Sequence, residues 1–470
     1  MRRAVPFVLA PVLAPVLALA LAGCSLAPKY VREARPVPDS WPVGDAYLAR
    51  TEAALPVVSY REVFTDARLQ ALVGQALANN SDLRVAAANL AAARARVDVQ
   101  RGAQLPQVGV GAGATRRSTE AGGPVTAWTA SGGISAFELD LFGRLANATR
   151  AEQETALASE ASARTVRLGL VADLANAWAD HAADAELLRI AQQTAVAARR
   201  SVALNRALLR GGVAARSDVG QAEQVLATAE ADLAAQTTAL AQDRNLVELL
   251  VGAPVDPALL PGDLASVGAS VRSVPAGTSS DVLLRRPDVI AAEYRLRAAN
   301  ADVGVARAEL FPRLSLTALV GLAANSFEGL FKPGALTSTL GGNAGYALFS
   351  GGSARANVRV SQAQRETALA TWEKAVQTAF REVADALARQ GTMADELAAV
   401  ERRTAAAADT ALLVEARYRG GVASSLESLD AQRSLYTAQR AEVASRLASV
   451  RSRITLYRVL GGDQLAPGTP

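Results

Sequence analysis

Arg210-Gly211-Gly212-Val213-Ala214 recurs 209 residues later as Arg419-Gly420-Gly421-Val422-Ala423, and the predicted fold follows from this repeat. The same offset carries Leu226 onto Leu435 and Gly252 onto Gly461. Self-similarity over such a distance indicates a duplicated unit. The chain therefore consists of two copies of roughly 200 residues, and we expect a pseudo-twofold architecture.

Two very long helices are predicted, one before each Arg-Gly-Gly turn. Residues 144–210 and 353–419 are equally long and contain no proline, and glycine follows each of them, as at many helix ends. If it is straight, each of these helices would be ~100 Å long. Apolar residues recur every seven positions in the second and in the helices that return after both turns, which predicts coiled-coil packing. The residues are Trp372, Ala379, Ala386, Met393, Val400, Ala407 and Val414, then Val219, Leu226, Leu233, Leu240 and Val247, then Leu429, Tyr436, Val443, Val450 and Tyr457.

A shorter helix and two strands precede each long helix. Composition predicts helices over 69–104 and 281–310, each ending before a proline. Strands are predicted at about 107–117 and 125–141, and at about 314–323 and 340–349. Their apolar residues alternate with small or polar ones, as in Val108-Gly109-Val110-Gly111, which is typical of membrane strands facing lipid on one side and water on the other.

Four strands are too few for a membrane barrel, whose smallest known size is about eight. An open sheet edge is not tolerated in lipid, because its backbone groups stay unpaired. The strands must therefore be completed by other copies of the chain. Two copies would give eight strands and three would give twelve, and the strand number leaves that choice open.

The N-terminus indicates export. Arg2 and Arg3 precede an apolar stretch interrupted by prolines, and residues 1–23 are predicted to be a signal peptide. It ends in Leu21-Ala22-Gly23-Cys24, which resembles the lipobox of bacterial lipoproteins and implies cleavage before Cys24 and lipidation of that residue. The residue directly after Cys24 is Ser25 and not an aspartate. By the same resemblance, this implies that the lipoprotein passes to the outer membrane. A chance cysteine after an ordinary signal is the alternative.

Composition excludes several other classes of protein. The chain has 1 Cys and 1 His, so an internal disulfide and a His/Cys metal cluster within one chain are excluded. The net charge is only +4, which does not argue for nucleic acid. We predict no cofactor and no metal apart from the covalent lipid, diacylglyceryl and N-acyl, at Cys24. No catalytic arrangement stands out, and His181 is interpreted as a packing or surface residue.

Several motifs in order resemble one family. They are the lipobox, Phe137-Glu138-Leu139-Asp140-Leu141-Phe142-Gly143-Arg144, Leu284-Arg285-Arg286-Pro287-Asp288-Val289, Ala308-Glu309-Leu310-Phe311-Pro312, and Arg417-Tyr418-Arg419-Gly420-Gly421-Val422 running into Leu429-Asp430-Ala431-Gln432-Arg433-Ser434-Leu435. Over residues 24–462 the chain resembles the TolC-like outer-membrane factors, in particular their lipoprotein branch of NodT-like and OprM-like outer-membrane efflux proteins.

The resemblance implies a mainly α fold with a small β part. Three copies would form a twelve-stranded outer-membrane β-barrel, continued by a periplasmic coiled-coil α-barrel with an equatorial belt. The domains would be the signal peptide 1–23, a lipidated and equatorial segment 24–66, the first repeat 67–252, an equatorial linker 253–280, the second repeat 281–462 and a tail 463–470.

The resemblance also implies a function. A homotrimer would be the passive exit duct of a tripartite efflux pump, with a periplasmic adaptor (a membrane fusion protein) and an inner-membrane transporter, RND in type, as partners. Drugs or other small amphiphiles would be the default cargo, which the sequence does not specify. A periplasmic coiled-coil structural lipoprotein is the alternative, but it leaves the four strands unexplained. An adaptor protein would need a lipoyl-like domain, of which we find no sign.

Two sets of residues are candidates for function. Leu426, Asp430 and Arg433 share a helix face by their spacing and, by the resemblance, would line the periplasmic aperture. From the residues alone, a solvated Asp–Arg pair is the simpler interpretation. The first repeat has Gln221 opposite Asp430, so one charged ring per trimer is expected. By the resemblance, the adaptor would dock at the two turns, which are Gly211, Gly212, Val213, Gly420, Gly421 and Val422.

Overall fold

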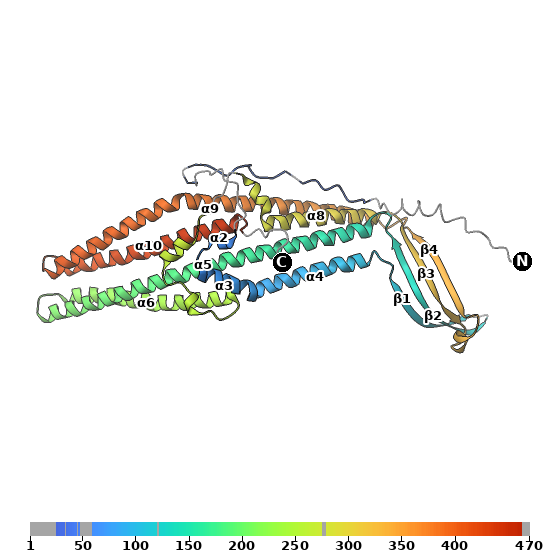
Figure 1. Cartoon of the computed structure of the whole chain (residues 1–470), viewed down its shortest axis with the longest axis horizontal. Helices are drawn as coiled ribbons and strands as arrows, with labels where there is room; N and C mark the ends of the chain where they lie inside the picture. The colour runs from blue at the N-terminus through green and yellow to red at the C-terminus, as the bar shows by residue number, and fades with distance from the viewer. Residues whose placement is uncertain are drawn as a thin grey trace. The chain divides into compact units, whose positions relative to one another are not determined.

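The computed structural model describes residues 25–462 except 33, 45, 48–58, 120–121 and 275–278. Its elements follow the predicted duplication, with helices, two strands, a long helix and a return helix in each half (Figure 1). The first half contains α2 (Tyr60–Val63), α3 (Ala67–Asn79), α4 (Ser81–Gly102), β1 (Val108–Thr119), β2 (Gly122–Leu139), α5 (Arg144–Arg210) and α6 (Arg216–Val251). The second contains η1 (Pro257–Leu259), α7 (Leu264–Ser270), η2 (Ser280–Arg285), α8 (Pro287–Ala308), β3 (Arg313–Ala324), η3 (Glu328–Phe331), β4 (Leu336–Gly345), α9 (Ser353–Arg419) and α10 (Ser425–Val459).

The chain divides into two compact units. One comprises the N-terminal segment up to Ala34 with residues 88–161 and 290–374, and it holds the sheet. The other comprises residues 35–87, 162–289 and the chain from Ala375, and it holds both Gly-Gly turns. Among the described residues, none of the helices combines the length and the apolarity needed to cross a membrane.

The four strands form one antiparallel sheet in the order β1-β2-β3-β4 (Figure 1). Residues directly opposite one another share a face, so the register defines both surfaces. One row across the apolar face is Val108, Ile134, Ala318 and Leu340, and the row behind it is Gly109, Gly133, Leu319 and Thr339. The predicted division into an apolar and a small or polar face is confirmed over most of the sheet. The exceptions include Leu319 and Val125 on the small or polar face, and Arg116, Thr126 and Ser338 on the apolar face.

The structure corrects one residue of this pattern. The alternation of Trp128, Ala130, Ile134 and Ala136 with small or polar residues predicts Ala136 on the apolar face, but the register shifts between Ile134 and Phe137. Ala136 has a φ of 55°, and its N–H donates to Thr317 Oγ1 at 3.3 Å. The bulge therefore places Phe137, opposite Leu316, on the apolar face in its stead.

The predicted bounds of the fourth strand were also wrong. The pattern placed it at 340–349, whereas β4 spans Leu336–Gly345. The whole of β4 pairs with β3, from Leu336 opposite Leu322 to Gly345 opposite Arg313. The ends of β4 are therefore set by its pairing with β3. The apolar alternation continues past Gly345 to Tyr346 and Leu348, which have no partner strand among the described residues.

The two shorter helices are each divided, which the composition did not predict. Asn80 interrupts 69–104, because its Oδ1 accepts from the N–H groups of Asp82 and Leu83 at 2.9 and 3.1 Å and so begins a new helix. In the second half the short helix η2 ends at Arg285, and α8 starts at Pro287. Proline at a first helical position is favourable, since its missing N–H would have no partner there.

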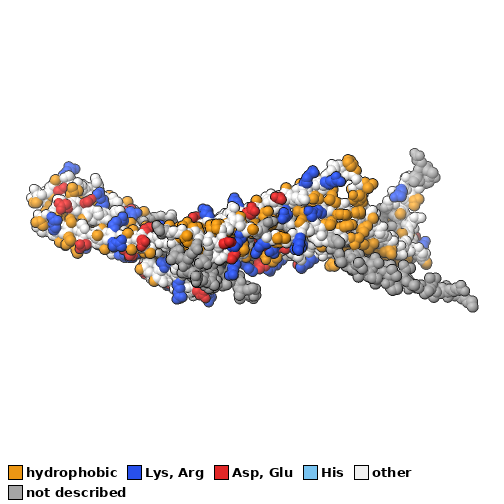
Figure 2. Space-filling view, turned by 90° about the horizontal axis from the view of Figure 1, so that it is seen from above, with side chains coloured by type: hydrophobic (Ala, Val, Ile, Leu, Met, Phe, Trp, Pro, Cys, Tyr) orange, Lys and Arg blue, Asp and Glu red, His pale blue; other side chains and the backbone are white. Residues whose placement is uncertain are grey.

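Both long helices have the predicted bounds, 144–210 and 353–419. In α9 the heptad residues Trp372, Ala379, Ala386 and Met393 are buried, and the three that follow are half-buried. Ion pairs join α5 to α6, as between Arg206 and Glu223 at 2.6 Å. On the face seen in Figure 2, basic and acidic side chains are interspersed over the helical surface.

The part of the expected equatorial segment 24–66 that follows Ala34 lies in the second unit, together with the expected equatorial linker. Val271 after α7 forms a bridge with Phe64, and Ser279 forms one with Ser40. Arg453 of α10 donates to the carbonyls of Gly268 and Val271 at 2.8 and 2.6 Å, which holds this segment in place. The C-terminal tail, 463–470, lies outside the described residues. A belt in the assembly therefore stays a prediction.

Candidate functional site

The two Gly-Gly turns are helix-hairpin turns with the same geometry, as predicted. Val213 N–H donates to the Leu208 carbonyl, and Val422 N–H donates to the Arg417 carbonyl, both at 2.9 Å. Gly212 and Gly421 have φ values of 74° and 75°, a region that disfavours any side chain. The valine that follows is exposed in both turns, at 76% for Val213 and 69% for Val422. Each hairpin thus ends in a rigid turn with one apolar side chain in solvent.

A cavity of about 370 Å³ lies near these turns, between α6 and α10. The three predicted aperture residues, Leu426, Asp430 and Arg433, all line it. Their spacing along α10 brings them to one face, as expected for residues three and four apart. Gln221, the repeat equivalent of Asp430, lines the same cavity from α6. The structure therefore brings the predicted residues together and adds their counterpart from the first repeat.

The charged pair of this cavity is solvent-exposed within the single chain. Arg433 Nη2 donates to Asp430 Oδ1 at 2.5 Å, and their side chains are 73% and 58% exposed. An exposed pair of this kind contributes less than about 1 kcal/mol. Stability therefore does not require Asp430, and its carboxylate is free to face solvent or another copy of the chain.

A second polar contact joins the two hairpins further along α10. Tyr436 Oη donates to Asp232 Oδ2 of α6 at 2.7 Å, and Arg440 donates to the same oxygen at 3.2 Å. Burial and the adjacent Asp232 carboxylate raise the pKa of Tyr436 to about 12. In the sequence, Tyr436 is recognisable only as a member of the apolar heptad positions. Asp232 is 204 residues away in the chain, and no local signal paired the two.

Nearer the turns, Tyr418 makes a third link between the hairpins. Its hydroxyl donates to Oδ1 of Asn205 on α5 at 3.3 Å, and Asn205 is 1% exposed. Asn205 is itself held in place, since its amide donates to the Ser201 carbonyl. The ends of the two hairpins are therefore joined by specific hydrogen bonds as well as by apolar packing of Val202, Ala222 and Leu429.

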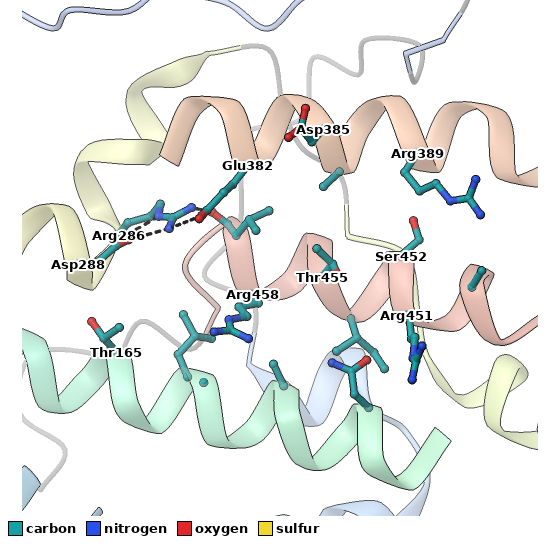
Figure 3. Close-up of a pocket in the computed structure, with 18 of the residues that line it drawn as sticks. Thr165, Arg286, Asp288, Glu382, Asp385, Arg389, Arg451, Ser452, Thr455 and Arg458 are labelled. Carbon is teal, nitrogen blue, oxygen red and sulfur yellow. Dashed lines mark hydrogen bonds and ion pairs between the residues drawn. The ribbon is translucent and has the colours of Figure 1, made fainter. Parts of the chain in front are cut away.

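A larger cavity of about 840 Å³ lies among α5, α9 and α10 (Figure 3). Arg286 borders it and is 7% exposed. Its Nη2 donates to Asp288 at 2.7 Å and to Glu382 at 2.8 Å, and Nη1 donates to the Val459 carbonyl at 2.9 Å. Burial alone would lower the pKa of Arg286, but the two carboxylates outweigh it and the pKa is raised. In the sequence, Arg286 is recognisable only as part of the motif Leu284-Arg285-Arg286-Pro287-Asp288-Val289.

The predicted lipidation site, Cys24, lies outside the described residues. The residues that follow it are attached to α5 and α8. Ser25 Oγ donates to Asn147 Oδ1 at 2.9 Å, and Asn300 donates to the Pro28 carbonyl at 2.7 Å. A Cβ on Gly304 would lie 2.7 Å from the Ala27 side chain, so this glycine leaves room for the segment.

His181 has a structural contact. Its Nδ1 lies 3.1 Å from the Pro261 carbonyl, which requires that nitrogen to carry the proton and donate. Burial lowers the pKa of the imidazole. The residue joins α5 to the segment after η1, in agreement with a packing role.

Comparisons with known proteins agree with this geometry. The family model described as outer membrane efflux protein matches residues 72–253 and 278–462. The antibiotic efflux pump outer membrane protein ArpC of Pseudomonas putida is 39% identical over 456 residues, covering 95% of this chain and 94% of that protein. The toluene efflux pump outer membrane protein TtgC, from a strain of the same species, gives the same identity and coverage.

A solved structure shares the fold. The crystal structure of the open state of the Neisseria gonorrhoeae MtrE outer membrane channel matches with a TM-score of 0.84 and 30% identity. The match covers 94% of this chain and 98% of that one. The duplicated hairpins, the sheet and the motifs after the lipobox all lie within the residues that the family model matches. This chain is therefore a member of the outer membrane efflux protein family.

Proposed function

We propose that this chain is the outer-membrane channel of a tripartite efflux pump and serves as a passive exit duct from the periplasm. The observation that carries the proposal is the four-stranded sheet with one apolar face. Its outer strands, β1 and β4, each have a single neighbour among the described strands. In a membrane their free edges need partner strands from other copies. In this proposal the chain is a passive channel and catalyses no reaction.

A homotrimer fits this requirement. Three copies would supply twelve strands, and the threefold axis would bring three Asp430 carboxylates toward one another at the periplasmic end. Like charges gathered in a narrow pore attract cations and can be held by arginine partners, here Arg433 of the same or a neighbouring copy. Gln221 would contribute no charge, so a single charged ring is expected.

The hairpin turns suit an adaptor partner. Val213 and Val422 are exposed apolar side chains on turns of fixed geometry, and a periplasmic adaptor would contact them. An inner-membrane transporter, RND in type, would supply the energy. Binding of the purified adaptor to Val422→Asp, compared with the wild-type chain, tests the contact, and unaltered affinity would remove this turn from the interface.

Cys24 would anchor the mature chain in the outer membrane. The contacts of Ser25, Ala27 and Pro28 with α5 and α8 support this proposal, because they hold the segment after Cys24 in the unit that contains the sheet. Mass spectrometry of the N-terminal peptide would detect the diacylglyceryl and N-acyl groups. An unmodified cysteine would contradict the proposal.

Drugs and other small amphiphiles are the proposed cargo. The relatives named above are described as antibiotic and toluene efflux pump components, and this supports amphiphiles of that size.

Single-channel conductance in planar bilayers tests the duct and its aperture together. We expect the purified wild-type oligomer to open rarely and Asp430→Ala to open more often, because the variant removes both the charged ring and its contact with Arg433. The matched control is Gln221→Ala in the first repeat, which leaves the ring intact. Unchanged conductance would remove Asp430 from the aperture. Absence of conductance from every folded oligomer would favour the structural lipoprotein.

A further inference from the structure

The segment that follows the predicted lipidation site is bound by α8 and by the start of α5. Residues 25–32, which we call the N-terminal strap, contain no helix or strand. Ser25 Oγ donates to Asn147 Oδ1 at 2.9 Å, and the Pro28 carbonyl accepts from Asn300 Nδ2 at 2.7 Å. Both asparagines are buried. The strap therefore satisfies polar groups that are withdrawn from water.

A buried carboxylate holds the other end of the strap. Arg32 forms an ion pair with Glu293, with Nε donating to Oε1 at 3.1 Å, and Tyr30 Oη donates to the same oxygen at 3.3 Å. Arg297 donates to Glu293 at 2.6 Å, and its Cζ lies 5.1 Å from the centroid of the Tyr30 ring. Burial alone would raise the pKa of Glu293, but its hydrogen bonds with Arg32 and Arg297 outweigh burial, and the pKa is lowered. One of the two cations that neutralise this buried carboxylate thus comes from the strap.

The surface of α8 leaves room for the strap between these two ends. A Cβ on Gly304 would lie 2.7 Å from the Cβ and 2.8 Å from the Cα of Ala27, closer than such atoms approach. One turn further on, Arg307 donates to the Leu26 carbonyl at 3.3 Å. Glycine is unfavourable in a helix interior compared with alanine, so the helix itself does not favour Gly304. The close approach of the strap explains it.

The first repeat has no equivalent of this site. The matching residues Arg101 and Arg307 align α4 with α8 at an offset of 206. At this offset Glu293, Asn300 and Gly304 correspond to Ala87, Arg94 and Asp98, and at the offset of 209 Asn147 corresponds to Ala356. Both α4 and α8 nevertheless have 22 residues. The duplicated helix therefore forms without the residues that contact the strap.

We propose that α8 and the start of α5 form a recognition site for the chain's own N-terminal strap, and that the bound strap ties the two repeats together beside the sheet. Asn147 belongs to the first repeat and α8 to the second, so one strap contacts both. Since α5 starts shortly after β2 ends at Leu139, the site also fixes where Cys24 leaves the folded unit, at the end of the sheet that adjoins the helices. The position of the lipid rests on the proposed lipidation of Cys24, whereas the site does not.

Trypsin cleavage of the purified full-length protein measures how often the strap leaves its site. Lys29 is exposed, but a protease cuts a bound segment only through its detached state. We expect slow cleavage after Lys29 in the wild type and several-fold faster cleavage in Gly304→Ala, because the new Cβ would collide with Ala27. Gly74→Ala in α3 is the matched control, since a Cβ there meets nothing within 4 Å. Equal rates in the wild type and Gly304→Ala would overturn the proposal.

The ion pair gives an independent test with the same readout. Arg32→Met and Glu293→Ala should each raise the rate of cleavage after Lys29 several-fold. The double variant should be cleaved no faster than Glu293→Ala alone, because both changes remove one contact. Val31→Ala, on an exposed side chain of the strap, is the control and should cleave like the wild type. A double variant whose rate is the product of the two single effects would contradict a shared site.

A lipid-free variant separates the site from the anchor. Cys24→Ser cannot be lipidated, and we expect it to keep the slow cleavage after Lys29. Rapid cleavage of this variant would mean that the lipid, and not the site, holds the strap. An unmodified Cys24 together with slow cleavage would refute the anchor alone and leave the recognition site intact.

Hydrogen exchange measures whether the strap ties the repeats together. In Arg32→Met, the amides of α8 between Glu293 and Gly304 and those at the start of α5 should exchange several-fold faster than in the wild type. The amides of α4, which has no strap, serve as the internal control and should keep their rates. Unchanged exchange in α8 and α5 would show that the strap is only a tether. None of these readouts needs channel activity, so their failure is distinct from failure of the duct.

Discussion

Arg286 shows how one side chain holds three segments of the second unit together. It precedes α8, and its guanidinium binds Glu382 of α9 and the carbonyl of Val459 at the end of α10. Since the planar guanidinium donates in several directions at once, a single residue can satisfy two carboxylates and a carbonyl. The motif Leu284-Arg285-Arg286-Pro287-Asp288 therefore has a structural purpose that its sequence alone does not reveal.

Replacing this residue tests that role. Arg286→Met should lower the free energy of unfolding by about 2–3 kcal/mol, because it leaves Asp288, Glu382 and a buried carbonyl without their donor. The value is below that of a fully buried pair because the two carboxylates are 40% and 35% exposed. Thermal unfolding followed by circular dichroism would measure it.

Two further variants control this experiment. Arg285→Met, at the exposed neighbouring position, should have little effect. Arg286→Lys should restore the charge but not all the hydrogen bonds, and should therefore be intermediate. An Arg286→Met protein as stable as the wild type would show that solvent satisfies the carboxylates equally well.

At the scale of elements, the hairpin turns determine where each pair of helices reverses direction. The two glycines of each turn are not equivalent. Gly421 has a φ of 75°, whereas a Cβ built on Gly420 would meet only ordinary contacts at 3.5 Å. The sequence pattern marks both glycines as turn residues, but only the backbone angles distinguish one from the other.

This difference gives a matched pair of variants. Gly421→Ala should destabilise the hairpin by about 1 kcal/mol, because alanine is unfavourable at positive φ. Gly420→Ala should be nearly neutral. Thermal midpoints of the two variants in the same detergent would compare them. Equal effects would mean that the backbone of the turn rearranges.

At the scale of the whole molecule, the sheet is the part that depends on its surroundings. Its apolar face carries side chains that the single chain leaves exposed, such as Leu340 at 87% and Val110 at 92%. Exposed apolar surface of this kind marks a contact with lipid or protein. The outer-membrane environment and the other copies of the chain would therefore complete this unit.

Neighbouring residues of β4 distinguish the two faces. Leu340→Arg should impair assembly in the outer membrane, since arginine on a lipid-facing strand costs about 2–4 kcal/mol near the bilayer centre. Thr339→Arg, one residue earlier and on the opposite face, should assemble normally. The amount of folded oligomer in outer-membrane fractions measures both. Equal losses from the two variants would show that the apolar face does not meet lipid.

Local periodicity was sufficient for much of the fold. The Arg-Gly-Gly turns, the heptads and the alternation in the strands each reflect a rule that acts within a few residues of chain. They were enough to predict the bounds of α5 and α9, both hairpin turns, the two faces of the sheet and the grouping of Leu426, Asp430 and Arg433.

Only the tertiary structure decided the features that depend on distant partners. The bulge at Ala136 and the ends of β4 follow from pairing with β3, and the break at Asn80 follows from a side chain that also donates to the Leu250 carbonyl. The Tyr436–Asp232 and Tyr418–Asn205 links join helices far apart in sequence. Their hydrogen bonds depend on how helices pack, and no periodic pattern along the chain encodes which polar residues that packing brings into contact.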